Sequence, residues 1–166
     1  DQIMKMFPVL RVGATPLRGL GVMCCLQALM LPGDYAQAAT IVDNATLDIN
    51  SSLPETDYLV RNNGVLNASG ANTRSITAQT GSTLNISGTT VVGNAGNEGV
   101  VVTSSKGTID QTSITSDDIG LAVNRSSVAA GGSSVTVSNS RITGDVAGAQ
   151  VTGLSTLSLI NTQVTG

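Results

Sequence analysis

The sequence predicts an all-β protein, a right-handed single-stranded parallel β-helix of about five turns that follows an N-terminal signal peptide. Three observations predict this fold. Short stretches of alternating aliphatic and polar residues recur through residues 39–166, glycine and asparagine stand at the breaks, and only 2% of the residues are aromatic. A turn of such a stack buries its apolar face only against neighbouring turns, so the same pattern must return in each one.

The first element is an expected signal peptide over residues 1–38. Three basic residues precede an apolar run from residue 19 to 31, and the small residues Ala36 and Ala38 follow it. A basic region, about a dozen apolar residues and a small-x-small site are typical of a cleaved secretory signal. We therefore expect cleavage between Ala38 and Ala39, which leaves residues 39–166 as the exported part.

Two alternatives to a cleaved signal are an amphipathic core helix and a lipoprotein signal. The part that follows has no helical period against which a core helix would pack. A lipoprotein signal needs a small residue before the cysteine, yet Met23 precedes Cys24, and Cys24 precedes Cys25. The apolar run is also shorter than the roughly 20 residues of a transmembrane helix. Both cysteines lie in the leader, so no disulfide is expected after it.

The exported part contains a nine-residue repeat with aliphatic residues at its second, fourth and ninth places. Three copies align without gaps, at residues 83–91, 134–142 and 156–164. A shorter copy is placed at residues 108–114, with Ile109 at the second place and Gln111 at the fourth, and a looser one starts at Thr46. The second place thus moves from Leu84 to Ile109, Val135 and Leu157, in steps of 25, 26 and 22 residues.

A second motif recurs between these copies, and it is expected to form another strand of each turn. It reads Gly-Val-Val-Val at residues 99–102, Gly-Leu-Ala-Val at 120–123 and Gly-Ala-Gln-Val at 148–151. The rival folds are a leucine-rich repeat, whose period is similar, and a β-sandwich. The leucine skeleton of the first is missing, and the shortage of aromatic residues weighs against the second.

Charge and composition exclude several classes of function. The chain has 8 Lys and Arg against 11 Asp and Glu, and it has no histidine. A nucleic-acid-binding protein needs a basic stripe or an aromatic stacking platform, and neither is present. Without histidine there is no imidazole base or ligand. We expect no cofactor, and we assign no catalytic, cofactor-binding or metal-binding residue.

A few residues could still carry chemistry. Asp110 and the pair Asp117-Asp118 are candidate acids for a polysaccharide-degrading enzyme, although solvated turn carboxylates explain the pair better. The Ser104-Ser105-Lys106 stretch has no nucleophile motif around it. Four Asn-x-Ser/Thr triplets are expected by chance in this composition, and they begin at Asn44, Asn67, Asn85 and Asn124.

The repeats STLNISGTTV, DDIGLAVN and SSVTVSNSRITG, after a long basic-led signal, resemble the passenger of a bacterial autotransporter of the pertactin type. This resemblance covers residues 39–166 and lies in pattern and composition. It implies a right-handed parallel β-helix that a C-terminal β-barrel of a longer chain carries to the bacterial surface, where it serves adhesion or host interaction. The sequence as written lacks that barrel, and we expect it to be the N-terminal part of a longer protein.

Two hypotheses of function follow. In the first, the chain is a non-catalytic, virulence-associated surface module that contacts a host surface or extracellular matrix. In the second, it is a secreted polysaccharide-degrading enzyme of the pectate-lyase-like type, with Asp110, Asp117 or Asp118 in its site. The scattered acids favour the first hypothesis, and with it a location at the cell surface, in the outer membrane or in the medium, or in the periplasm if the chain is truncated.

Overall fold

The computed structural model describes residues 38–126 and 131–166. The chain divides into two units, residues 1–34 and 35–166. The predicted signal peptide therefore lies outside the described residues, except for its last residue, Ala38. Ala36 also lies outside them, and Ala38 and Ala39 directly precede the first strand.

The described residues form three parallel β-sheets and no helix. Sheet A contains β1 (Thr40–Asp43), β3 (Tyr58–Arg61), β6 (Ile76–Gln79), β9 (Val100–Thr103), β12 (Ile119–Asn124) and β15 (Ala147–Val151). Sheet B contains β2 (Thr46–Ile49), β4 (Val65–Ser69), β7 (Thr83–Ser87), β10 (Lys106–Asp110), β13 (Ser134–Ser138) and β16 (Thr156–Ile160). Sheet C contains β5 (Asn72–Thr73), β8 (Thr90–Val92), β11 (Ser113–Ser116), β14 (Arg141–Gly144) and β17 (Gln163–Thr165).

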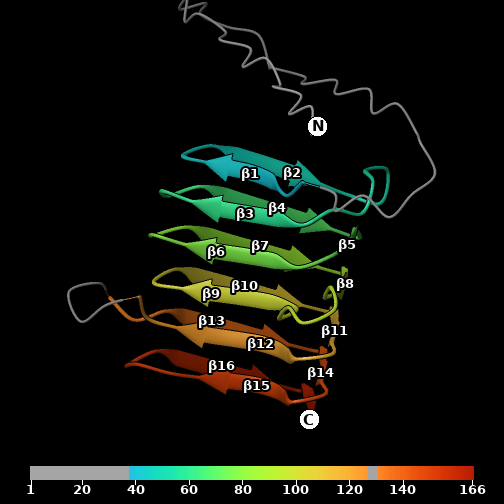
Figure 1. Ribbon diagram of the computed structural model, residues 1–166, viewed down its shortest axis with the longest axis vertical. Helices are drawn as coiled ribbons and strands as arrows, with labels where there is room; N and C mark the ends of the chain where they lie inside the picture. The colour runs from blue at the N-terminus through green and yellow to red at the C-terminus, as the bar shows by residue number, and fades with distance from the viewer. Residues whose placement is uncertain (1–37, 127–130) are drawn as a thin grey trace, which may run out of the picture. The chain divides into compact units, whose positions relative to one another are not determined.

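The chain visits the sheets in the order A, B, C and then returns to A one level further along, which makes a β-solenoid (Figure 1). We number its levels as coils 1 to 6, starting with β1–β2 and continuing with three strands in each coil. The predicted β-helix is confirmed, with six coils where about five were expected. Every strand pair is parallel, unlike the antiparallel pairs of a sandwich, and β-strands form all three sides, unlike the helical side of a leucine-rich repeat.

The core is a set of aliphatic columns, because the residue at a given place of each coil lies beside the same place of the next. Leu66 pairs with Leu84 in sheet B, and Ile114 pairs with Val91 and Ile142 in sheet C. These side chains are at most 1% exposed. One polar atom enters the column of sheet C, since the hydroxyl of Thr73 is buried and has no hydrogen-bond partner.

The structure corrects the alignment of one repeat and adds another. Gly107 pairs with Leu84 and Val135, and Ile109 pairs with Ile86 and Val137. The copy placed at residues 108–114 therefore starts at Lys106 and has the full nine residues, with a glycine at the second place. Coil 2 contributes a further copy over residues 65–73, which the sequence did not reveal because Ala68 and Thr73 replace the usual aliphatic residues.

The second motif is confirmed in register, since Leu121 pairs with Val100 and Ala149. Its leading glycines have a steric cause. A Cβ atom on Gly99 would come within 2.7 Å of the carbonyl oxygen of Gly120, and one on Gly120 within 2.6 Å of that of Gly148. In coils 4 to 6, only glycine lets successive coils approach this closely where the chain enters sheet A.

Serine hydroxyls line the inside of the corner between sheets A and B. The backbone N–H of Ser82 donates to Oγ of Ser105 at 3.1 Å, Ser105 N–H donates to Ser133 Oγ at 3.2 Å, and Ser133 N–H donates to Ser155 Oγ at 3.1 Å. Each hydroxyl also donates to a backbone carbonyl of its own or a neighbouring coil, as Ser105 Oγ does to Thr103 at 3.0 Å. This ladder gives buried polar groups partners where the chain leaves one sheet for the next.

Candidate functional site

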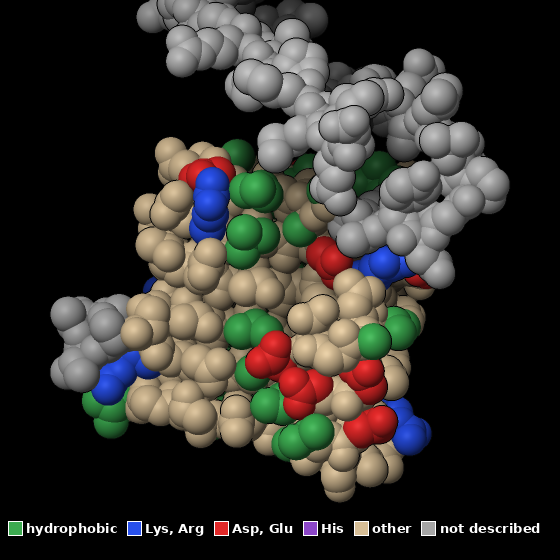
Figure 2. Space-filling view, viewed as in Figure 1, with side chains coloured by type: hydrophobic (Ala, Val, Ile, Leu, Met, Phe, Trp, Pro, Cys, Tyr) green, Lys and Arg blue, Asp and Glu red, His purple; other side chains and the backbone are tan. Residues whose placement is uncertain are grey.

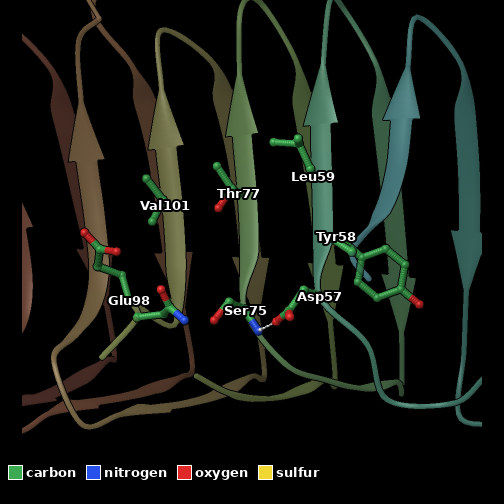
Figure 3. Close-up of a pocket in the computed structure, with 9 residues that line it drawn as sticks. Asp57, Tyr58, Leu59, Ser75, Thr77, Glu98 and Val101 are labelled. Atoms are coloured by element: carbon green, nitrogen blue, oxygen red, sulfur yellow. Dashed lines mark hydrogen bonds between the residues drawn. The ribbon is translucent and has the colours of Figure 1, made fainter. Parts of the chain in front are cut away.

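Apolar and acidic side chains lie beside each other on the outer face of sheet A (Figure 2). A groove of about 300 Å³ lies on this face. Outward side chains of three adjacent strands form its floor, namely Leu59 of β3, Thr77 of β6 and Val101 of β9 (Figure 3). Asp57 and Glu98 stand at its edge (Figure 3).

Asp57 is the anchor of the loop that borders the groove. Its two carboxylate oxygens accept hydrogen bonds from Nδ2 of Asn94 at 2.8 and 2.9 Å. The backbone N–H of Ser75 donates to one of them at 3.1 Å. These bonds tie the loop between β8 and β9 back onto an earlier coil. The carboxylate is thus engaged in holding the loop in place.

The Asp117-Asp118 pair lies on the turn between β11 and β12, beside that loop. Both oxygens of Asp117 accept the backbone N–H of Gly96, at 3.0 and 3.1 Å. The hydroxyl of Ser116 donates to the carbonyl of Asn97 at 2.7 Å. In the described part of the chain, the carboxylates of Glu98 and Asp118 make no hydrogen bond or ion pair.

Asp110 lies at a different corner of the solenoid. It ends β10, whereas Asp117 follows β11, so the whole of strand β11 separates the two residues. A four-residue strand spans roughly 13 Å. The structure therefore does not bring together the three acids that the sequence singled out.

The Asp110 carboxylate is held by two donors from the next coil, Oγ of Ser138 at 2.6 Å and Nδ2 of Asn139 at 2.9 Å. These hydrogen bonds hold the pKa of Asp110 below its ordinary value, because they favour the charged form. A carboxylate in this environment remains ionised, so it is poorly suited to act as a general acid near neutral pH.

The Ser104-Ser105-Lys106 stretch forms no catalytic pair. Ser105 points into the core, where its hydroxyl belongs to the serine ladder, while Lys106 is exposed on the outer face of sheet B. Adjacent strand residues point to opposite faces of a sheet. Lys106 instead lines a second groove of about 420 Å³ with hydroxyl-bearing residues of three coils.

A polar ladder runs along the outer face of sheet B. Nδ2 of Asn67 donates to Oδ1 of Asp48 at 2.7 Å, Nδ2 of Asn85 donates to Oδ1 of Asn67 at 2.8 Å, and Oγ1 of Thr108 donates to Oδ1 of Asn85 at 3.1 Å. Three of the four Asn-x-Ser/Thr triplets begin with side chains that bond neighbouring coils. Asn67 and Asn85 do so in this ladder, and Oδ1 of Asn124 accepts a hydrogen bond from Oγ1 of Thr152 at 2.9 Å.

The residues that mark the groove on sheet A were missed in the sequence. Asp57, Asn94 and Glu98 lie outside the two recurring motifs, and loop residues carry no periodic signal. The outward position of Leu59 and Val101 was readable from strand alternation, once the neighbouring inward residues were assigned to the core. What the sequence did not contain is the proximity of the loop to coil 2.

The groove presents both apolar and acidic side chains. Among residues 38–126 and 131–166, no group of three or more Asp, Glu, His or Cys side chains is placed to hold a metal ion. Over the same residues, no helix is long and apolar enough to cross a membrane. The groove combines an apolar floor with a carboxylate edge, an arrangement suited to binding.

No protein-family model, curated protein or solved structure matches this chain.

Proposed function

We propose that the chain is a non-catalytic binding module displayed outside the cell, an autotransporter-type passenger that contacts a host surface or the extracellular matrix. The observation that carries this proposal is the outer face of sheet A, where an apolar strip with an acidic edge extends over several coils. A broad, repeating surface of this kind supports binding to a large partner.

The hydrogen bonds that the acidic side chains make within the protein give further support. Asp57 bonds Asn94, Asp110 bonds two residues of the next coil, and Asp117 bonds a backbone N–H. Each of these carboxylates supports local structure. A polysaccharide-degrading enzyme would instead need its acid and base on either side of one sugar linkage.

The test is a pair of assays on the full chain. In the first, the protein is applied to immobilised extracellular-matrix protein and to whole cells, and we expect saturable binding. In the second, it is incubated with polygalacturonate and other polyuronates, and we expect no new reducing or unsaturated ends. Depolymerisation that disappears in D117N or D118N would replace the proposal with the enzymatic one, and absence of saturable binding would remove it.

A further inference from the structure

We propose that the outer face of sheet A docks a cationic amphipathic polypeptide segment, whose apolar side lies on the strip and whose Lys and Arg side chains meet the acidic edge. This inference rests on the proposed binding function and specifies the chemistry of the partner. It is carried by two features of the same face, an apolar column and a concentration of negative charge.

The apolar column consists of the outward residues that pair across successive coils of sheet A. Ile41 pairs with Leu59, Leu59 with Thr77, Thr77 with Val101, and Val101 with Ala122. Ala122 is only 1% exposed, so the accessible strip runs from Ile41 to Val101. Three of its four side chains are apolar, and that of Ile41 is 54% exposed. The outward column of sheet B that runs through Asn67 and Asn85 is polar throughout, so these two columns differ in character.

The acidic edge is formed by the segments through which the chain enters sheet A. The described residues carry nine carboxylate side chains, and six of them lie on these segments. They are Glu55, Asp57, Glu98, Asp117, Asp118 and Asp145. Of the five described Lys and Arg residues, only Arg74 lies on the same segments. The edge therefore has a net charge of −5 (one Arg against six acids).

Several of these charges are not neutralised within the described residues. Asp57 and Asp117 accept hydrogen bonds from neutral donors, and no side-chain hydrogen bond or ion pair reaches Glu98, Asp118 or Asp145 there. The single ion pair of the described residues joins Arg61 and Asp43, near the opposite ends of the strands. The net negative charge of this edge attracts a cationic partner.

The spacing of the two features sets the shape of the partner. The strip and the edge both run along the stack, with one position every 4.8 Å or so. A segment laid along the stack meets the two features with opposite flanks, so its apolar and cationic residues must be separated on different sides. Apolar contact supplies affinity and the charges supply orientation and a faster encounter.

The experiment measures the binding of a short synthetic peptide of Leu and Lys, patterned so that the two residue types occupy opposite sides of a helix. The full chain is titrated with this peptide and with a scrambled peptide of the same composition. We expect saturable binding of the patterned peptide, at least tenfold weaker binding of the scrambled one, and a decrease with added salt, because exposed charges are screened within about 8 Å at physiological ionic strength.

Two variants of the face separate its contributions. The triple variant E98Q/D117N/D118N removes three charges and keeps hydrogen-bonding oxygens. The double variant L59T/V101T replaces two apolar residues of the strip with threonine, the residue already present at Thr77. We expect each to weaken peptide binding at least tenfold. The matched control D48N/D110N removes two charges from the face of sheet B and should leave binding within twofold of the wild type. Unfolding temperatures of all three variants check that the fold is kept.

The outcomes distinguish this proposal from the proposed function. Equal binding of the scrambled peptide, or equal weakening in the control variant, would show a nonspecific charge effect and overturn the docking surface. The same variants are then compared on matrix protein and cells. Binding there that survives E98Q/D117N/D118N and L59T/V101T would leave the proposed function intact and refute the docking surface as its site.

Discussion

A single backbone conformation recurs at the corner between sheets B and C. The sixth residue of each nine-residue repeat has a positive φ, between 48° and 61°, whichever side chain it bears. The residues at this place are Gly70, Gly88, Gln111, Asn139 and Asn161. Glycine and asparagine adopt this left-handed region readily, and glutamine adopts it at a cost.

Gln111→Asn should therefore stabilise the protein. Asparagine occupies the same corner in the next two coils, and it is several-fold enriched in this backbone region. We expect the free energy of unfolding to rise by about 0.5–1 kcal/mol, measured by urea denaturation.

The matched control for this prediction is Gly88→Ala. A Cβ atom there would have no neighbour closer than 3.9 Å, so the expected loss of about 1 kcal/mol is conformational and not steric. A Gln111→Asn variant no more stable than the wild type would mean that the side chain of Gln111 makes a compensating contribution.

The hydrogen bonds of Asp110 make one part of the stability dependent on pH. Its folded pKa lies below that of the unfolded chain, so the charged form stabilises the fold above the unfolded value, near 4. This contribution is lost as the pH falls through the lowered folded pKa. The difference in unfolding midpoint between the wild type and Asp110→Asn should be constant above pH 5 and change progressively below it. Ser138→Ala, which removes a donor, should reduce that change.

At the scale of the element, strand β10 has an unfilled place in its aliphatic column. Gly107 lies where other coils have Leu84 and Val135. A Cβ atom on Gly107 would lie 3.6 Å from both methyl groups of Val135 and 3.9 Å from Cβ of Leu84, which are ordinary contact distances.

Gly107→Ala should therefore stabilise the strand by about 1–1.5 kcal/mol, through the lower entropy of the unfolded chain and the burial of one methyl group. Differential scanning calorimetry should show a higher melting temperature. Gly99→Ala is the contrasting variant, since its Cβ would collide with a carbonyl oxygen of the next coil, and its melting temperature should fall. A decrease for both variants would contradict the idea of an unfilled place.

The sequence predicted those strands whose inward places carry large aliphatic residues. The three complete copies at residues 83–91, 134–142 and 156–164 were all confirmed in register. The pattern failed at Gly107, where a glycine stands at an aliphatic place. The sequence alignment was therefore shifted by two residues, and Ile109 was assigned to the second place instead of the fourth. A slip of two keeps the alternation of faces, so alternation by itself could not expose the error.

The candidate site was less predictable than the strands. Loop geometry decides which residues border the groove, and the bond from Asn94 to Asp57 joins positions that are 37 residues apart. Strand periodicity reports which residues point outward. It does not report which loop folds back over them, because that depends on hydrogen bonds between coils.

At the scale of the whole molecule, each coil packs against its neighbours. Equivalent residues pair in every coil, so one coil can take the place of another. Val100 pairs with Leu121, so removal of residues 100–120 deletes one coil and places Leu121 opposite Ile76. The inward columns then continue, and we expect a folded protein of five coils with a lower free energy of unfolding.

Removal of residues 100–119 is the matched control, because it leaves one extra residue and turns the following strand over. We expect this variant to be largely unfolded by circular dichroism and by urea denaturation, whereas the deletion of residues 100–120 keeps its β-sheet signal and a cooperative transition. Equal behaviour of the two deletions would refute register as the determinant of stacking.

The polar ladder on sheet B gives the molecule a direction. Every amide or hydroxyl in it donates towards the same end, and the series finishes on the carboxylate of Asp48. The direction towards coil 1 and the direction towards coil 6 are therefore chemically different along this face, as the two directions are along a peptide or a sugar chain.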